Sequence, residues 1–266
     1  MTIKQLLIWG AKQLTNSDSP NLDSELLLGL VLKKNKTFLF TYPEKSVTRI
    51  QTNSFQKLIR LRAQHWPIAY LTHSRNFFGL DFYVDKNVLI PRPWTEGLVA
   101  EAVGILKNRT GIKILDVGTG SGAIIVSLAH ALGSRNQYFA SDYSAKALPV
   151  AKKNAKKYSV KITFKKSDLL KNWKQEFDVI TANLPYLEKE TDPSTKREPK
   201  IALLSASKGL RHYQNLIHQL SAWRQHPKFL FLECEPRQAR PLNILAKKLL
   251  PHTQVYITTD SSAAVK

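Results

Sequence analysis

Cysteine is almost absent from this chain, because Cys234 is the only one among 266 residues. A single cysteine excludes a disulfide framework and a cysteine metal site within the chain, so the sequence predicts no metal. Long apolar runs are missing too, and none approaches the roughly 18 residues that a membrane-spanning helix needs. Residues 1–10 lack the pattern of a signal peptide and are expected to begin a helix. We therefore expect a cytoplasmic protein without a membrane partner.

Acidic residues are scarce relative to basic ones. Forty Lys and Arg face twenty Asp and Glu, which gives a formal net charge of +20 at pH 7. The densest stretch, residues 146–174, contains ten lysines and one acid, Asp168. Such a basic surface favours an anionic partner, and contact with nucleic acid is the first hypothesis. A solvated lysine-rich surface is the alternative, because charge alone says nothing about fold or chemistry.

Residues 1–73 are predicted to form a small helical domain. Apolar residues recur at helical spacing in three stretches, residues 3–14, 22–31 and 47–64. This part contains no glycine-rich loop and no cluster of acid–base groups, which favours a role in docking a substrate over a role in the reaction. The length of 266 residues leaves room for a second domain, and 43% hydrophobic residues is ordinary for a globular protein.

Residues 74–93 are predicted to link the two domains through a β-hairpin. The aromatic stretch from Phe77 to Val84 contains Gly79, where a hairpin can turn. Pro91 and Pro93 then flank Arg92, and two prolines stiffen the chain and hold the arginine side chain in a defined direction. We interpret this segment as a loop that lines the active site, with Arg92 as a substrate-binding residue. A rigid linker is the alternative interpretation.

Residues 94–266 predict an α/β domain with a parallel sheet. Short apolar runs alternate with helical patterns, which is typical of parallel strands joined by helices on both faces of the sheet. We expect a Rossmann-like domain, and a monomer. The expected strands are residues 113–117, 137–141, 162–165, 177–182, 228–233 and 254–259.

A glycine-rich turn follows the first expected strand of this domain. Asp116 precedes three glycines spaced G-x-G-x-G, whereas a dinucleotide-binding turn is spaced G-x-G-x-x-G. Glycine lets the backbone turn sharply and approach a ligand. A carboxylate at this point would repel a pyrophosphate but attract the sulfonium and α-amino groups of S-adenosylmethionine, which has no phosphate. The residues predicted to bind this cofactor at the turn are Asp116, Gly118, Thr119, Gly120, Ser121 and Gly122.

Two further acids end the next two expected strands. Asp142 is placed to accept hydrogen bonds from both ribose hydroxyls of the cofactor. Asp168 is placed to accept a hydrogen bond from the adenine amino group, and Leu169 to pack on the purine. Each acid alone has an alternative as a helix cap or a surface charge. Three acids at three successive strand ends, together with the turn, predict an S-adenosylmethionine-dependent methyltransferase.

The fourth expected strand ends in Asn183-Leu184-Pro185-Tyr186. A planar amino group on an sp2 carbon is a poor nucleophile with a delocalised lone pair, so it needs acceptors for both N–H bonds rather than a strong base. The Asn183 side-chain oxygen and the Leu184 carbonyl can accept them, Pro185 fixes the turn, and Tyr186 can stack on the planar group. We predict Asn183, Pro185 and Tyr186 as catalytic residues that act by positioning and electrostatics. The acceptor can be a glutamine amide, adenine N6 or cytosine N4.

Several segments together resemble the HemK/PrmC family, the protein-(glutamine-N5) methyltransferases that modify peptide chain release factors. The segments follow the family order from about residue 67 to residue 235, and the Ile-Pro-Arg-Pro segment is more specific than the Asn-x-Pro-Tyr box. The matching segments are Pro67 to Leu71, Phe77 to Val84, Val88 to Pro93, Asp116 to Ala123, Asp142 to Asn154, Asn183 to Tyr186 and Glu198 to Leu203.

The resemblance implies an acceptor, a docking role and a set of contacts. The acceptor is the glutamine of a Gly-Gly-Gln motif, and the N-terminal domain helps to dock the release factor. Residues 118–122, Asp142, Leu169 and Asn183 contact the cofactor, and residues 183–186 contact the substrate glutamine.

The sequence departs from the family pattern at four places. Leu184 replaces a usual Pro, Trp94 replaces a usual acid, residues 205–207 replace a turn with Gly and an acid, and Glu235 replaces a usual Gly. Two other readings stay open. One is an amino-methyltransferase that acts on adenine N6 or cytosine N4 of RNA or DNA, which the net charge favours. The other is a binding protein of low activity that keeps the fold.

Overall fold

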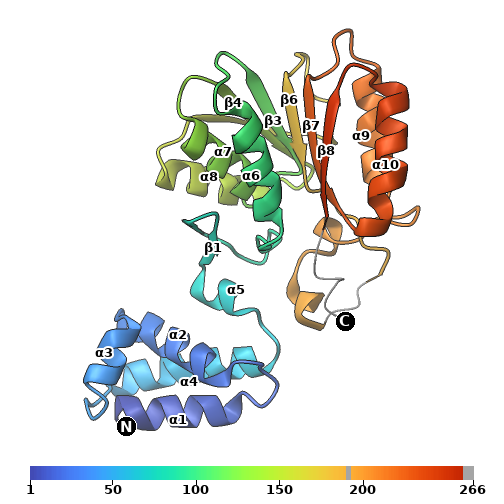
Figure 1. Cartoon of the computed structure of the whole chain (residues 1–266). Coiled ribbons are helices and arrows are strands. Elements are labelled where there is room, and N and C mark those ends of the chain that lie inside the picture. Colours follow the sequence, from blue (N-terminus) through green and yellow to red (C-terminus); the bar gives the residue numbers. More distant parts are fainter. Residues whose placement is uncertain (190–192, 260–266) are drawn as a thin grey trace. The chain divides into compact units, whose positions relative to one another are not determined.

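The computed structural model describes residues 1–189 and 193–259, and their contacts divide the chain into two units (Figure 1). The first unit is Met1–Ser74 together with the segment that ends at Arg197, and the second unit contains the rest of the chain from Arg75 on. The linker was expected at residues 74–93; in this division Ser74 belongs to the first unit and residues 75–93 belong to the second. Within the described ranges, no helix combines the length and the apolar character needed to cross a bilayer.

The first unit is helical. Helices α1 and α4 each begin with a capping box, in which Thr2 and Thr48 satisfy backbone N–H groups of the first turn. Apolar side chains of α1, α2 and α4 form a core that includes Leu6, Leu27 and Phe55. The described elements of this unit are α1 (Ile3–Gln13), α2 (Pro20–Leu32), α3 (Lys36–Thr41), α4 (Arg49–Ala63), α5 (Ile68–Thr72) and η1 (Pro193–Arg197).

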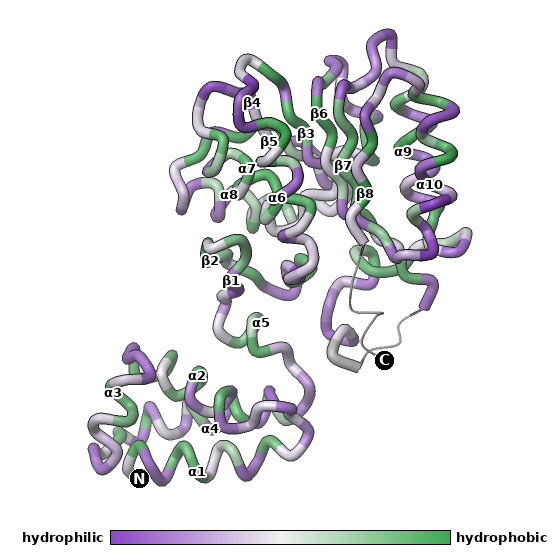
Figure 2. The backbone as a smooth tube through the Cα atoms, viewed as in Figure 1, coloured by the Kyte–Doolittle hydropathy of each residue, from purple (hydrophilic) through white to green (hydrophobic). Residues whose placement is uncertain are grey.

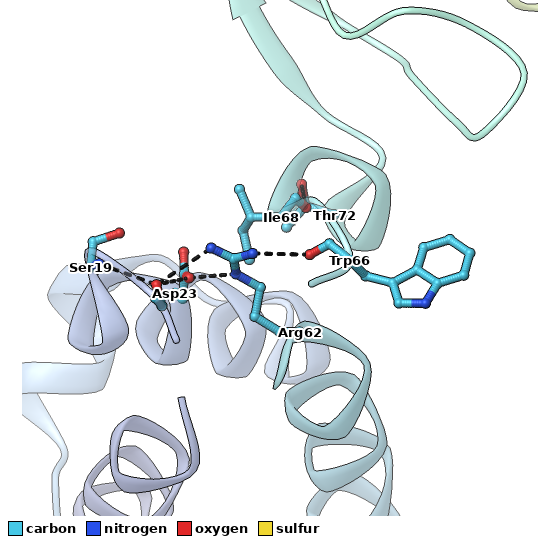
Figure 3. Close-up of polar contacts among 7 residues, drawn as sticks. Ser19, Asp23, Arg62, Trp66, Ile68 and Thr72 are labelled. Atoms are coloured by element: carbon cyan, nitrogen blue, oxygen red, sulfur yellow. Dashed lines mark hydrogen bonds and ion pairs between the residues drawn. The ribbon is translucent and has the colours of Figure 1, made fainter. Parts of the chain in front are cut away.

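An ion pair inside the first unit joins α2 to α4 (Figure 3). Nε of Arg62 lies 2.6 Å from Oδ2 of Asp23, whose side chain is 4% exposed. Arg62 also donates to the carbonyl of Trp66 at 3.2 Å, and Ser17 donates to Asp23 at 2.7 Å. A buried carboxylate needs such partners, so this cluster fixes α2, α4 and the chain that leaves α4.

The second unit begins with an antiparallel hairpin of β1 (Arg75–Phe77) and β2 (Leu80–Phe82). Phe78 and Gly79 have φ values of 50° and 73°, the positive values that a tight two-residue hairpin turn requires. Phe77 and Phe82 are fully buried, with ring centroids 5.9 Å apart. The hairpin expected from the sequence is therefore present.

A six-stranded parallel sheet forms the centre of the described part of the second unit. Its order is β5-β4-β3-β6-β7-β8, so the strand order reverses between β3 and β6. Strands β3, β6 and β7 are buried along most of their length, in keeping with their largely hydrophobic colouring in Figure 2. This arrangement confirms the predicted α/β class. The elements are α6 (Thr95–Leu106), β3 (Lys113–Val117), α7 (Ala123–Leu132), β4 (Gln137–Asp142), α8 (Ala147–Lys157), β5 (Ile162–Lys166), β6 (Val179–Ala182), η2 (Lys200–Ala202), α9 (Arg211–Ser221), β7 (Phe229–Cys234), α10 (Pro236–Leu249) and β8 (Gln254–Thr259).

Helices cover both faces of this sheet (Figure 1). Leu98 of α6 and Ile125 of α7 belong to one buried cluster, and Tyr213 of α9 and Leu242 of α10 belong to the other. Packing on both faces holds the carboxyl ends of β3 and β6 side by side. In open α/β sheets, ligands bind at the carboxyl ends of strands where the strand order reverses.

Candidate active site

The strand register brings the glycine turn and the Asn183–Tyr186 box together. Val117 lies opposite Ala182 in the parallel pair of β3 and β6. The next residues, Gly118 and Asn183, therefore leave the sheet side by side. Gly118 has a φ of +75°, and a Cβ atom built on it would lie 2.8 Å from Cδ2 of Leu184. The turn and the box thus touch, and a side chain at position 118 would push them apart.

A cavity of about 200 Å³ opens at these carboxyl ends. Gly120 lines the cavity with a φ of +53°, and open space lies where its Cβ would be. The predicted residues in the lining are Gly118, Gly120, Asp142, Asp168, Leu169, Asn183, Leu184 and Pro185, beside Val88, Leu89, Ile201 and His212 among others.

Asp116 lies behind the cavity wall and does not line it. The residue is 1% exposed, and its Oδ1 accepts a hydrogen bond from the hydroxyl of Thr181 at 2.8 Å. Burial raises the pKa of Asp116 to about 6, and the hydrogen bond from Thr181 opposes that rise. Its predicted role is therefore an attraction of cationic groups from behind the turn, and this role stays a prediction.

Thr119, Ser121 and Gly122 shape the turn without lining the cavity. The Gly122 N–H donates to the Thr119 carbonyl at 2.7 Å, which closes the turn on itself. The Ser121 carbonyl accepts from the side chain of Asn154 at 2.8 Å, and the same side chain donates to the Tyr83 carbonyl at 2.9 Å. Helix α8 thereby ties the turn to the segment after the hairpin. Contacts of these three residues with a cofactor stay predictions.

Asp142 is anchored to the glycine turn. Its Oδ2 accepts from the Gly120 N–H at 2.8 Å, and its Oδ1 accepts from the Ser144 N–H at 2.7 Å. Burial raises the pKa of Asp142, and these two hydrogen bonds oppose the rise. Each carboxylate oxygen has two lone pairs, so Asp142 retains the capacity to accept hydroxyl groups of a ligand.

Asp168, Leu169 and His212 contribute another part of the wall. Asp168 is 47% exposed and pairs with Lys171 at 2.5 Å. Leu169 is buried and takes a positive φ of 53°. Burial lowers the pKa of His212, which favours its neutral form at pH 7. The adenine contacts predicted for Asp168 and Leu169 stay predictions.

Asn183 is held by two partners on the side away from the cavity. Its Nδ2 lies 2.7 Å from Oε1 of Glu233 and 3.1 Å from Oγ1 of Thr95. A carboxylate oxygen only accepts hydrogen bonds, so the amide nitrogen must face Glu233. Neither partner lines the cavity, whereas Asn183 does. The remaining polar atom, Oδ1, is therefore the one that Asn183 offers to a ligand.

The hydroxyl of Tyr213, in α9, contacts the backbone of the Asn183–Tyr186 box at Leu184. This fully buried hydroxyl accepts from the Leu184 N–H at 2.9 Å and donates to the carbonyl of Glu233. The Leu184 carbonyl lies 3.2 Å from the same hydroxyl, which has only one proton to give. The Leu184 carbonyl thus keeps acceptor capacity, and Leu184 and Pro185 both line the cavity.

Tyr186 lies in the buried cluster around α9 and α10 and does not line the cavity. Its hydroxyl lies 3.4 Å from Oε1 of Glu233, and its carbonyl accepts from the side chain of Gln238 at 2.9 Å. These contacts fix the end of the box. The predicted stacking of the Tyr186 ring on a substrate group stays a prediction.

Two family models match most of the chain. The PrmC N-terminal domain matches residues 5–72, and a methyltransferase domain matches residues 108–254. Release factor glutamine methyltransferases of Buchnera aphidicola subsp. Acyrthosiphon pisum and Rhodopirellula baltica are each 35% identical to this chain. The alignments cover 93% of this chain and 91% of the first relative, and 97% and 92% for the second. The relative from Bacillus cereus is 31% identical, over 98% of this chain and 95% of its own length.

The chain belongs to the release factor glutamine methyltransferase family. The family resemblance stated from the sequence is thereby confirmed. The cofactor is S-adenosylmethionine, in keeping with the methyltransferase domain. The site fits this cofactor in three observed respects: the open space beside Gly120, the anchored carboxylate of Asp142, and a partly apolar wall that includes Leu169. In the described part of the chain, no group of three His, Cys, Asp or Glu side chains is arranged to hold a metal ion.

In this family member, the side chain of Arg92 forms an ion pair with the buried carboxylate of Glu198. Its Nη2 lies 2.5 Å from Oε1 of Glu198, and Oε2 of Glu198 accepts from the Ile90 N–H at 3.0 Å. The side chain of Glu198 is 2% exposed, and Arg92 does not line the cavity. The ion pair fastens the chain around Pro199 to the Ile90–Pro93 segment. Substrate binding by Arg92 stays a prediction.

Four residues that support the candidate site could not be identified from the sequence: Thr95, Glu198, Tyr213 and Glu233. Their partners are remote in sequence, so no local pattern marks them as a group. Weak signals exist for two of them. Glu233 is a carboxylate at the end of an apolar strand, and Glu198 belongs to a segment that matches the family.

Proposed function

We propose that this chain transfers a methyl group from S-adenosylmethionine to the side-chain amide nitrogen, N5, of a glutamine in a peptide chain release factor. The glutamine is that of a Gly-Gly-Gln motif. Family membership over nearly the whole length supports this proposal. The structural observation that carries it is the orientation of Asn183, whose amide nitrogen is held by Glu233 and Thr95.

The reaction needs two acceptors and a fixed geometry. An amide nitrogen has a delocalised lone pair, and it becomes nucleophilic as the nitrogen rehybridises. Oδ1 of Asn183 and the carbonyl of Leu184 both belong to cavity-lining residues, and they are the acceptors that would hold the two N–H bonds of the glutamine. The cofactor, when bound, supplies an electrophilic methyl group on a sulfonium.

Positioning provides the rest of the catalysis. Tyr213 fixes the Leu184 backbone, and Thr95 and Glu233 fix the Asn183 side chain, so neither acceptor needs to reorganise when the substrate binds. Pro185 has no N–H to compete for these acceptors. Asp142 would hold the ribose hydroxyls, and the glycine turn would let the cofactor approach the backbone.

The test is methyl transfer to a purified release factor. Mass spectrometry of its proteolytic peptides, after incubation with isotopically labelled S-adenosylmethionine, should find one methyl group on the peptide that contains Gly-Gly-Gln. A release factor with that glutamine replaced by glutamate is the matched control and should stay unlabelled. Label in RNA or DNA but not in the release factor would support a base amino-methyltransferase instead. Cofactor binding without transfer to any acceptor would support a binding protein of low activity.

Asn183→Ala separates the two halves of the site. It should lower transfer by about 10²-fold or more, the effect of removing one positioned polar group, because the substrate loses an acceptor. Cofactor affinity, measured by isothermal titration calorimetry, should stay within about tenfold. Equal losses in both quantities would place Asn183 mainly in cofactor binding.

The first unit, in this proposal, docks the release factor. The match of residues 5–72 to the PrmC N-terminal domain supports this role. Because release factors act in the cytoplasm, we place the reaction there, with the enzyme as a monomer. Light scattering of the purified chain measures its mass in solution, and a dimer would contradict the last point.

We further propose that a lysine face of the second unit contacts nucleic acid. Ten exposed lysines define this face, and three of them lie over the aromatic rings of Tyr83, Tyr158 and Trp173. Asp168 is the only acid within the same stretch, residues 146–174. The lysine face consists of Lys146, Lys152, Lys153, Lys156, Lys157, Lys161, Lys165, Lys166, Lys171 and Lys174.

Salt dependence tests the lysine face. Affinity for a single-stranded RNA probe, measured by fluorescence anisotropy, should fall with salt with a slope of about −0.7 per phosphate neutralised. Replacing the four lysines of α8 (Lys152, Lys153, Lys156, Lys157) with glutamine should reduce that slope. A control variant with four glutamines in the first unit (at Lys4, Lys12, Lys33 and Lys34) should reduce it less. Equal slopes in both variants would contradict the proposal, and a selective loss of release factor binding would assign the face to an acidic protein surface.

A further inference from the structure

Glu233 is the penultimate residue of β7 and lies beside the Asn183–Tyr186 box. The residue is fully buried, and its Oε1 accepts from Nδ2 of Asn183 at 2.7 Å. The hydroxyl of Tyr186 lies 3.4 Å from the same oxygen. Glu233 does not line the cavity, so it can influence a ligand only through residues that do.

Two neighbours of Glu233, Tyr213 and Cys234, have pKa values that its negative charge helps to raise. Burial raises the pKa of Tyr213 well above its usual value, and the charge of Glu233 adds to the rise. Burial also raises the pKa of Cys234 to about 12, with the same contribution from Glu233. A buried carboxylate is costly unless it is hydrogen-bonded, and strongly perturbed groups cluster at functional sites. Glu233 thus lies among groups that burial perturbs, in contact with Asn183 of the acceptor site.

The orientation of Asn183 is the second consequence of Glu233. An amide whose oxygen faced the carboxylate would place two acceptors against each other. Thr95 adds a second partner for the amide nitrogen at 3.1 Å. Glu233 thus selects the one orientation in which the oxygen of Asn183 remains for the substrate.

We infer that Glu233 is a positioning residue for methyl transfer that acts through the amide of Asn183; this inference rests on the proposed function. The substrate N–H donates to Oδ1 of Asn183, and Nδ2 of Asn183 donates to Glu233. The substrate nitrogen forms a bond to the methyl carbon and becomes positively charged, while the electron pair of the broken sulfur–carbon bond returns to sulfur. The nitrogen then loses one proton to water, and Glu233 exchanges none.

The charge of Glu233 stabilises this positive charge through the intervening amide. Hydrogen bonds in a chain polarise one another, so a carboxylate behind Asn183 makes Oδ1 a stronger acceptor. Since the positive charge exists only during transfer, the effect falls on kcat rather than on ground-state binding. If Glu233 were only structural, replacing it would change the stability of the fold, KM for the release factor and Kd for S-adenosylmethionine together.

Glu233→Gln isolates the charge, because it keeps the shape and one acceptor oxygen. With a release factor as substrate, kcat should fall by about tenfold, which reflects the difference between a charged and a neutral hydrogen-bond acceptor. KM for the release factor and Kd for S-adenosylmethionine should stay within about twofold. Thermal unfolding of the variant shows whether the fold is kept.

Two companion variants make the test specific. Asp178→Asn is the matched control, because Asp178 lies just before the opposite end of β6 and accepts from the Lys113 N–H there. It removes a carboxylate of the same sheet and should leave kcat unchanged within about twofold. Thr95→Val removes the second partner of Asn183 and should lower kcat by about threefold, since Glu233 still orients the amide. If Glu233→Gln does not fold, Thr95→Val still tests whether the orientation of the Asn183 amide matters for transfer. A fall in kcat without a change in KM supports that role, and an unchanged kcat contradicts it.

The outcomes separate the inference from the proposed function. Transfer by the wild type with an unchanged kcat for Glu233→Gln overturns the inference alone. Parallel losses in kcat, KM, Kd and stability assign Glu233 a structural role and also overturn it. A loss for Thr95→Val larger than that for Glu233→Gln moves the orienting role to Thr95. No transfer by the wild type to any release factor overturns both the proposed function and the inference.

Discussion

Asp116 should make the stability of the second unit fall as pH rises through the acidic range. The carboxyl group is fully buried behind the glycine turn, and burial raises its pKa from 3.8 to about 6. Well below pH 3.8, both the folded and the unfolded chain hold the proton, and Asp116 contributes nothing. Between about pH 4 and 6, the unfolded chain releases the proton more readily than the folded one. Unfolding therefore becomes easier as pH rises, and above about pH 6 the cost is constant.

The size of this effect follows from the two pKa values. A rise from 3.8 to about 6 corresponds to about 3 kcal/mol at about 1.36 kcal/mol per pKa unit. The perturbation is Asp116→Asn, which keeps the shape of the side chain and an oxygen that can accept from Thr181. The variant does not ionise, so its free energy of unfolding lacks this pH dependence. The stability of the wild type, relative to the variant, should fall by about 2.4 kcal/mol between pH 4 and pH 7, because part of the full effect of about 3 kcal/mol already occurs below pH 4.

The assay is urea unfolding of both proteins at several pH values between 4 and 7.5. The quantity to compare is how the difference in free energy of unfolding between the two proteins changes with pH. A destabilisation by the amide that does not depend on pH does not affect this change. Asp178→Asn, a partly exposed carboxylate elsewhere on the sheet, gives the background for removing one acid. A difference between wild type and Asp116→Asn that does not change with pH, or that favours the wild type as pH rises, would refute the reasoning.

Three further predictions concern the same site. Tyr213→Phe leaves the buried Leu184 N–H without its acceptor and should lower the free energy of unfolding by about 1–3 kcal/mol, as measured by urea unfolding, with transfer reduced more than cofactor affinity. Gly118→Ala forces a side chain into a positive φ and against Leu184, at a cost of about 1–2 kcal/mol or more. A double-mutant cycle with Leu184→Ala should recover part of that loss, and strict additivity would contradict the contact. Asp142→Ala should weaken S-adenosylmethionine binding by about 1–3 kcal/mol in calorimetry, and saturating cofactor should restore most of the turnover; unchanged affinity would remove Asp142 from the cofactor site.

Much of the fold could be predicted because its signals are local. Lys113–Val117 is a largely buried strand, and its apolar residues Ile114, Leu115 and Val117 stand directly before the glycine turn. Parallel strands in such a sheet end at one edge, so Asp142 and Asn183 were expected there, and both line the cavity. The hairpin at Phe78 and Gly79 has equally local causes.

The residues that hold the predicted site residues in place could not be predicted, because their contacts join distant segments of the chain. Thr95 meets Asn183 across 88 residues, and Arg92 meets Glu198 across 106. Nothing in the sequence around Glu233 indicates that its side chain ends 2.7 Å from an amide. The degree of burial of Asp116 could not be predicted from the sequence either. An acid before a glycine turn indicates a charge near a ligand, but the sequence does not reveal that Asp116 is only 1% exposed.

The segment that ends at Arg197 has a consequence for exchanging parts between family members. Arg197 belongs to the first unit, where its guanidinium lies 5.4 Å from the ring of Trp66 and donates to the Gln64 carbonyl at 3.3 Å. The next residue, Glu198, belongs to the second unit. The N-terminal unit is thus not one continuous module. A chimera that takes residues 1–74 from one relative must also take residues 193–197 from it, or Trp66 faces a foreign partner.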